Sequence, residues 1–328
     1  MKLPTGVTLH RELSLMPDTD ARPEYTRLLD PDALAKIHRL ELVARGTVEG
    51  FVSGRHRSPY KGFSVEFAEH RQYVPGDDVG DLDWRVYGKT DRYYVKQYVE
   101  ETNLRATILV DASGSMRYTG TRAARHNGRH LSKFEYSQYL AASLAHMMIH
   151  QQDAVGLVMF DTTIRRYVPA RSKASHLRTM LEELAGTEAG GETALAPILH
   201  DIAERVHRRG LIILISDLFD DPEEIINALH HFRYRKHEVI ILHVMAHEEL
   251  TFPFTSQALF RDLEVRRRAV QLDPGTIRAE YLDRVRQFVR RIEGGCGRMR
   301  IDYVPVCTRE KYDVVLTNYL ARRRRQVK

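Results

Sequence analysis

ATILVDASGSM, residues 106–116, starts as an apolar run and then changes to an acid, two serines and a glycine. Such a run predicts a buried β-strand that ends at Asp111. An unpaired carboxylate is costly to bury, so Asp111 is expected to emerge at the end of the strand or to be compensated there. Ser113 and Ser115 follow at alternate positions, and two hydroxyls spaced in this way within a turn can point in the same direction.

From residue 105 onward, apolar strands alternate with amphipathic helices. This alternation predicts an α/β fold in which a mostly parallel sheet is covered by helices on both faces. The strands predicted after the first are 154–160, 162–168, 211–216, 238–245 and 300–306. The first two of these are close enough to form an antiparallel pair at an edge of the sheet.

Local signals predict where the helices begin and end. Ser132 and Glu135 form a capping box, and Asp221–Pro222 supplies an N-cap and a first helical residue. A helix that starts at Thr276 is expected to stop at Gly294–Gly295. The other predicted helices are one that carries Leu177, Leu181 and Leu184, and those at 194–209 and 309–321.

Four segments are predicted along the chain. Residues 1–60 form an N-terminal extension with a helix that opens at Asp30–Pro31, and residues 61–104 form a small β-containing module. Residues 105–321 form the α/β domain, and residues 322–328 form a basic tail.

Composition indicates a soluble protein, with 43% hydrophobic and 29% charged residues. The first twenty residues contain no apolar core of a secretory signal, and no stretch approaches the roughly 20 apolar residues that cross a bilayer. Cys296 and Cys307 lack the spacing of a disulfide framework or a zinc site. These features predict a location in the reducing cytoplasm.

Basic residues are concentrated at the C-terminal end, where residues 261–328 hold 18 Arg or Lys against 9 Asp or Glu. Such a charge run is typical of a solvated helix end and tail. A contact with nucleic acid or an anionic membrane surface is the alternative. No aromatic residues interleave with the run at Arg322–Arg325, which disfavours single-strand binding.

Oxygen-bearing side chains lie in three predicted loops. Asp217 comes directly after a second apolar strand, as Asp111 does, and Thr193 lies between a double glycine and a helix. Strand ends of a parallel sheet meet at one edge, so these groups and the two serines are expected to converge. Carboxylates and hydroxyls suit a hard cation such as Mg²⁺ or Mn²⁺. Alternatively, each residue caps a helix or a turn. The predicted metal ligands are Asp111, Ser113, Ser115, Thr193 and Asp217.

The pattern Asp-x-Ser-x-Ser, then a distant Thr, then a strand that ends in Asp resembles the metal-ion-dependent adhesion site of von Willebrand factor type A domains. The resemblance covers about residues 105–321 and implies the fold of that family. It further implies that the serines and the threonine bind Mg²⁺ directly, while the aspartates bind directly or through water. An acidic group of a protein partner would complete the coordination of the metal.

The preceding segment, GFSVEFAEHRQYVPGDDVGDLDWRVYGKTDRYYVKQY, closely resembles the bacterial domain of unknown function family 58. Members of that family are commonly encoded beside MoxR-type AAA+ ATPases, so the resemblance implies such a partner. Gly80 stands in a region where the family often has Arg. The residues that carry the resemblance are Gly62, Glu66, Phe67, Arg71, Tyr73, Pro75, Gly76, Asp77, Asp78, Asp83, Trp84 and Lys96.

The acidic stretch from Asp77 to Asp83 is typical of turns, in which Asp side chains bond nearby backbone amides. The alternatives are a contact surface, salt bridges to neighbouring basic residues or, least favoured, a second metal site. The stretch has no assigned oxygen ligands from other segments.

Two functions from different classes follow. The first is a non-enzymatic, metal-dependent interaction module that works with a MoxR-type AAA+ ATPase in the assembly or maturation of protein complexes. The second is a metal-dependent hydrolase of a phosphoryl or acyl substrate. No phosphate-binding P-loop and no nucleophile elbow occurs in the sequence. We therefore expect the partner, and not this chain, to hydrolyse ATP.

Overall fold

A computed structural model describes residues 24–31, 65–74, 82–100, 104–264 and 269–326. The helix predicted after Pro31 and most of the acidic stretch lie outside these residues. Among the described helices, none is long and apolar enough to cross a membrane.

A six-stranded sheet forms the centre of the fold, with the strand order β12-β9-β8-β3-β6-β7. Neighbouring strands pair in parallel except for β6 and β7, which form an antiparallel pair at one edge. The predicted mostly parallel sheet with an antiparallel edge pair is therefore confirmed. The six strands are β3 (Arg105–Asp111), β6 (Ala154–Phe160), β7 (Ile164–Arg171), β8 (Leu211–Ser216), β9 (Glu238–Met245) and β12 (Asp302–Cys307).

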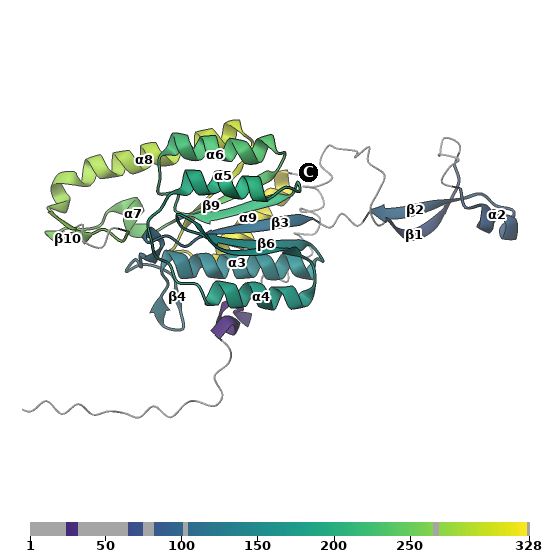
Figure 1. The fold of residues 1–328 in the computed structure, drawn as a ribbon, viewed down its shortest axis with the longest axis horizontal. Coiled ribbons are helices and arrows are strands. Elements are labelled where there is room, and N and C mark those ends of the chain that lie inside the picture. Colours follow the sequence, from purple (N-terminus) through teal and green to yellow (C-terminus); the bar gives the residue numbers. More distant parts are fainter. Residues whose placement is uncertain (1–23, 32–64, 75–81, 101–103, 265–268, 327–328) are drawn as a thin grey trace, which may run out of the picture.

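Helices cover both faces of this sheet, as predicted (Figure 1). Residues of β3 alternate between the two faces: Ile108 and Val110 pack in one hydrophobic cluster and Leu109 in the other. The first cluster also contains residues of α3 (Lys133–His150), α4 (Ala174–Ala185) and α9 (Tyr312–Gln326). The second contains residues of α5 (Leu195–Arg205), α6 (Pro222–Tyr234) and α8 (Pro274–Arg298). This arrangement confirms the predicted von Willebrand factor A-like fold.

Further short strands and helices lie outside the six-stranded sheet and the helices that cover it. The strands β1 and β2 form an antiparallel hairpin. Asp83 caps the helix between them, because its Oδ1 accepts a hydrogen bond from Arg85 N at 2.9 Å. Asp83 therefore bonds a nearby backbone amide, as expected of the acidic stretch. These elements are η1 (Glu24–Leu28), β1 (Val65–Gln72), α2 (Trp84–Thr90), β2 (Tyr94–Glu100), η3 (Ser115–Arg117), β4 (Arg125–His126), β5 (Arg129–His130), α7 (His247–Thr251), β10 (Ala258–Arg261) and β11 (Ala269–Leu272).

The predicted end of the α8 helix at Gly294–Gly295 is wrong, since α8 continues to Arg298. Gly295 allows close packing of α8 and does not end the helix. A Cβ at this position would lie 2.5 Å from Ile226 Cδ1 and 2.6 Å from Ile226 Cγ1, so the glycine lets α8 approach α6 closely. The helix α9 likewise runs to Gln326, past its predicted end at residue 321.

Replacing Gly295 by Ala should lower the free energy of unfolding by about 1 kcal/mol, measured by urea denaturation. Ala favours a helix by about 1 kcal/mol over Gly. Crowding against buried Ile226 should outweigh this gain, because overpacking costs about 1–3 kcal/mol.

Gly297 is the matched control in the same helix, since a Cβ there would meet no atom within 4 Å. Gly297→Ala should therefore leave stability unchanged or raise it. Equal effects of the two substitutions would contradict the packing role of Gly295.

Candidate functional site

Two carboxylates lie side by side where the order of the strands reverses. Asp111 is the last residue of β3, and Asp217 follows β8, the parallel neighbour of β3. After β3 the chain adds β6 and β7 on one side of it and then returns to place β8 on the other side. Ligands of open α/β sheets bind at such a reversal, outside the carboxyl ends of the strands.

The side chain of Asp111 is completely buried and is held by hydroxyl and amide groups. Its Oδ2 accepts a hydrogen bond from Ser216 Oγ at 2.6 Å, and its Oδ1 accepts one from Ser113 N at 2.9 Å. Ser113 Oγ lies 3.1 Å from Ser115 Oγ. The predicted motif therefore forms a compact turn in which the three side chains lie together.

Electrostatics distinguishes Asp111 from Asp217. Burial, reinforced by repulsion from Asp217, raises the pKa of Asp111 to about 7. Burial alone would also raise the pKa of Asp217, but the nearby Lys133 ammonium and a hydrogen bond from Ser115 hold that pKa below its usual value. The structure thus keeps Asp217 ionised and leaves Asp111 without a cationic partner among its hydrogen bonds.

Lys133 is the internal cation of the site. Its side chain is 2% exposed, and its Nζ lies 2.7 Å from Asp217 Oδ2 and 2.6 Å from Glu249 Oε1. Burial disfavours the ammonium, yet the two carboxylates raise the pKa of Lys133 above its usual value. Because Lys133 is the first residue of α3, the capping box at Ser132 and Glu135 fixes the position from which its side chain extends.

The loop that carries Thr193 contacts the turn after β3 through its backbone. Gly190 N donates to Ala112 O at 2.8 Å, and Gly114 N donates to Gly191 O at 2.9 Å. Gly191 has a φ of 89°, a conformation that favours glycine. The Thr193 hydroxyl itself donates to Glu264, so Thr193 joins the site through its loop and not through a direct bond to the serines.

The donor set suits a hard divalent cation. Asp111, Ser113, Ser115 and Asp217 offer only oxygen atoms, which is the ligand type that Mg²⁺ takes in proteins. Within the described residues, no group of three or more His, Cys, Asp or Glu side chains is arranged to hold a metal ion. A cation at this site would therefore have to use hydroxyl ligands beside the carboxylates.

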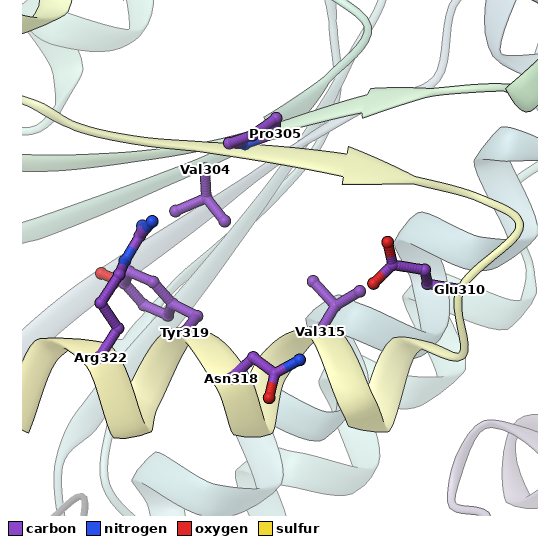
Figure 2. A pocket seen from close by; sticks show the side chains of 7 residues that line it. All are labelled: Val304, Pro305, Glu310, Val315, Asn318, Tyr319 and Arg322. Atoms are coloured by element: carbon purple, nitrogen blue, oxygen red, sulfur yellow. The ribbon is translucent and has the colours of Figure 1, made fainter. Parts of the chain in front are cut away.

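A groove of about 430 Å³ opens beside Asp217 and Lys133. Its walls include Phe219, which is 69% exposed, and Phe288 of α8. A second, smaller cavity of about 180 Å³ lies between β12 and α9, and Figure 2 shows the side chains that line it. That cavity lies along an edge strand, which β9 and β8 separate from β3. Of these two cavities, the groove is the one that Asp217 lines.

Sequence reasoning missed three charged residues of this region: Lys133, Glu249 and Glu264. The capping box located the start of α3, but no sequence signal indicated that Lys133 would be buried. Its partners Asp217 and Glu249 lie 84 and 116 positions away along the chain. Ser216 is a further residue of the site that the sequence did not indicate, since it donates a hydrogen bond to Asp111 across the two strands.

The sheet order, the helices on both faces and the Asp-x-Ser-x-Ser turn define a von Willebrand factor A-like protein. A model of the family described as Protein of unknown function DUF58 matches residues 69–290. The chain belongs to this family.

Uncharacterized proteins of Mycobacterium tuberculosis and Mycobacterium bovis are 28% identical to this chain over 238 residues. The matched region covers 72% of this chain and 72% of each of those proteins. Solved structures of similar fold include an aerotolerance-related membrane protein from Bacteroides fragilis, with 15% identity and a TM-score of 0.43 over 68% of this chain and 99% of that one. The von Willebrand factor A domain of SpRpn10 has 11% identity and a TM-score of 0.39, over 66% of this chain and 95% of that one.

Replacing Lys133 by Met should lower the free energy of unfolding by about 3–5 kcal/mol, because a buried carboxylate then loses its partner. Urea denaturation in EDTA measures the change. Asp217→Asn, added to the Lys133 variant, should recover part of the loss, since the uncompensated charge is removed.

Lys173→Met is the matched control, because Lys173 is an exposed lysine at the start of α4. It should change the stability by less than about 0.5 kcal/mol. If both lysine variants are equally stable, the ammonium of Lys133 does not hold the site together.

The stability of the metal-free protein should depend on pH through Asp111. A pKa of about 7 in the folded state, against 3.8 for an ordinary aspartate, means that the folded state holds this proton more tightly than the unfolded state does. The contribution to stability is present below pH 4 and is lost as the pH rises to 7. Relative to Asp111→Asn, wild type should lose on the order of 2 kcal/mol between pH 5 and pH 7.5.

Urea denaturation in EDTA at the two pH values measures this difference. Asp221→Asn changes an exposed N-cap aspartate of α6 and should keep the pH dependence of the wild type. Parallel pH profiles of wild type and Asp111→Asn would show that Asp111 ionises normally.

Proposed function

We propose that this chain is a metal-dependent protein-interaction module that works with a MoxR-type AAA+ ATPase in the assembly or maturation of protein complexes. A von Willebrand factor A-like fold suggests a protein-interaction module. The metal, Mg²⁺ or Mn²⁺, would be held by Asp111, Ser113, Ser115, Thr193 and Asp217. An acidic side chain of the partner would be the group recognised.

The observation that carries this proposal is the convergence of hydroxyl and carboxylate oxygens at the ends of β3 and β8. Ser113 and Ser115 lie 3.1 Å apart at their hydroxyl oxygens, beside a buried carboxylate whose pKa is raised. A nearby cation would stabilise the ionised form of such a carboxylate, which burial disfavours. Because two carboxylates and neutral hydroxyls would not cancel all of its electrostatic attraction, a Mg²⁺ ion at this site would still attract a further anion.

The groove beside Asp217 supports contact with a protein. Its apolar wall at Phe219, Val285 and Phe288 can receive an apolar side chain of a partner. Aromatic residues are enriched at protein–protein interfaces, and Phe219 is exposed. An acidic residue flanked by an apolar one is therefore the feature that we expect the partner to present.

A metal-dependent hydrolase is the second candidate and would need a base beside the metal. His243 contacts the site, but both of its ring nitrogens are already engaged. Nε2 lies 2.9 Å from Asp217 O, and Nδ1 lies 2.6 Å from Tyr303 Oη. Burial also lowers the pKa of His243 to about 4, which makes it a weak base. These contacts favour the interaction module.

Capture of a purified MoxR-type AAA+ ATPase on the immobilised chain should require Mg²⁺ and should be lost in EDTA. The double variant Ser113→Ala, Ser115→Ala should reduce capture at least tenfold, because two predicted ligands are removed. Melting curves recorded in parallel should show a folded protein, since both residues follow the core strand.

The matched control is Ser172→Ala, Ser175→Ala, which removes two exposed serine hydroxyls near the start of α4. This variant should capture the ATPase as wild type does. Capture that persists in EDTA and in the Ser113, Ser115 variant would place the contact elsewhere on the surface.

A further inference from the structure

The loops that lead into β8 and β9 lie side by side at the amino ends of the strands, opposite the candidate site. β8 and β9 are parallel neighbours, and Leu211 at the start of β8 pairs with Glu238 at the start of β9. The two loops also contact each other directly, because His237 Nε2 lies 3.1 Å from Val206 O. Together they form one surface, which we call the basic end after its five cationic residues: Arg208, Arg209, Arg233, Arg235 and Lys236.

Three of these five cations are not used by the fold. Arg233 donates a hydrogen bond to His237 O at 2.7 Å, and so helps to hold its loop. Arg208, Arg209 and Lys236 are exposed, and their charged groups form no hydrogen bond or ion pair within the part of the chain that the structure describes. Basic residues are favoured in the last turn of a helix, but these three follow the last residues of α5 and α6. Compensation of the helix ends therefore does not account for them.

The acids of this region do not neutralise the basic end. Burial raises the pKa of Glu238 to about 7, although nearby arginines, Arg323 foremost, oppose this rise. Asp302 is already paired with Arg323 of α9. The exposed Glu204 is a further carboxylate beside the five cations. The basic end therefore keeps an excess of positive charge at neutral pH and attracts anions.

An aromatic ring stands among these charges. Tyr234, between Arg233 and Arg235, is the last residue of α6 and is 89% exposed. A single exposed apolar side chain is common on protein surfaces. A ring that is flanked by cations free to bind phosphates, however, is the combination that binds single-stranded nucleic acid, because bases stack on aromatic rings while the cations hold the backbone.

We propose that the basic end binds single-stranded nucleic acid, with phosphates on Arg208, Arg209 and Lys236 and a base on the ring of Tyr234. A duplex fits less well, since its bases are already stacked on one another. The formal net charge of the chain, +6, favours the approach of such a polyanion. This activity goes beyond the metal-dependent contact proposed above and does not depend on it, because the two sites lie at opposite ends of the strands.

A second stretch of the chain has the same residue types and supplies the matched control. Arg165, Arg166 and Tyr167 are exposed on β7. Both arginines are paired, however: Arg165 Nε lies 3.6 Å from Asp161 Oδ2, and Arg166 Nε lies 2.9 Å from Glu183 Oε2. The control therefore removes the same groups from a place where acids already neutralise the cations.

Fluorescence anisotropy measures binding of a labelled oligothymidylate of about 15 nucleotides, in EDTA and at several salt concentrations. The duplex of the same length, heparin as a polyanion without bases, and phosphatidylglycerol vesicles are the comparison ligands. The variants are Tyr234→Ala, Tyr234→Phe and the double variant Arg208→Ala, Arg209→Ala. Their controls are Tyr167→Ala and the double variant Arg165→Ala, Arg166→Ala.

Tyr234→Ala should weaken binding of the oligothymidylate about fivefold or more and leave heparin binding unchanged, because only a base stacks on the ring. Tyr234→Phe should bind as wild type does. The Arg208, Arg209 variant should weaken binding of both ligands about tenfold. It should also reduce the salt slope for the oligothymidylate by about 1.4, since each phosphate contact on a single strand contributes about 0.7. Both control variants should match wild type.

Four results would overturn the inference. The first is that wild type fails to bind the oligothymidylate, including the case in which it binds only the vesicles. The second is that the Tyr234 and Arg208, Arg209 variants bind as their controls do, which would place the contact elsewhere on the chain. The third is that Tyr234→Ala weakens heparin and oligothymidylate binding equally, so that no base is stacked. The fourth is that the duplex binds more tightly than the single strand.

Discussion

The rest of the site depends on one constraint: two neighbouring parallel strands place a carboxylate at or directly after their carboxyl ends. Asp111 and Asp217 repel each other in a region where both side chains are almost inaccessible to water. The structure resolves this repulsion unequally. An ammonium neutralises Asp217, while the hydrogen bonds that Asp111 accepts within the described part of the chain come from the Ser216 hydroxyl and the Ser113 amide. A site that is electrostatically incomplete on one side is a suitable place for a cation to bind.

The helix α3 links this charge balance to the core. Lys133 begins the helix, and the residues that follow are buried along most of its length. A capping box at Ser132 and Glu135 satisfies the first backbone amides, so the helix start is well defined. Glu249 of α7 holds the same ammonium from the other side. Packing of α3 and neutralisation of Asp217 therefore depend on each other.

Much of the fold could be predicted from the sequence, because strands buried on both faces are continuously apolar. The predicted bounds of β6, β8 and β9 match the structure at both ends. The helix end predicted at Gly294–Gly295 failed, since a close helix contact and a helix stop both select glycine. The partners of Lys133 and Thr193 could not be predicted, because tertiary folding alone brings such distant residues together. The metal at the candidate site stays a prediction.

The two edges of the sheet carry a further consequence. Both edge strands contain a proline, Pro169 in β7 and Pro305 in β12, and β7 also exposes Arg165 and Arg166. Proline cannot donate a backbone hydrogen bond, and charged side chains discourage a neighbouring strand. Extension of the sheet by a second copy of the chain, or by a peptide strand, is therefore disfavoured at both edges. The same features disfavour aggregation through the open edges of the sheet. Another molecule would then bind at loops, such as those after β3 and β8, and not at a sheet edge.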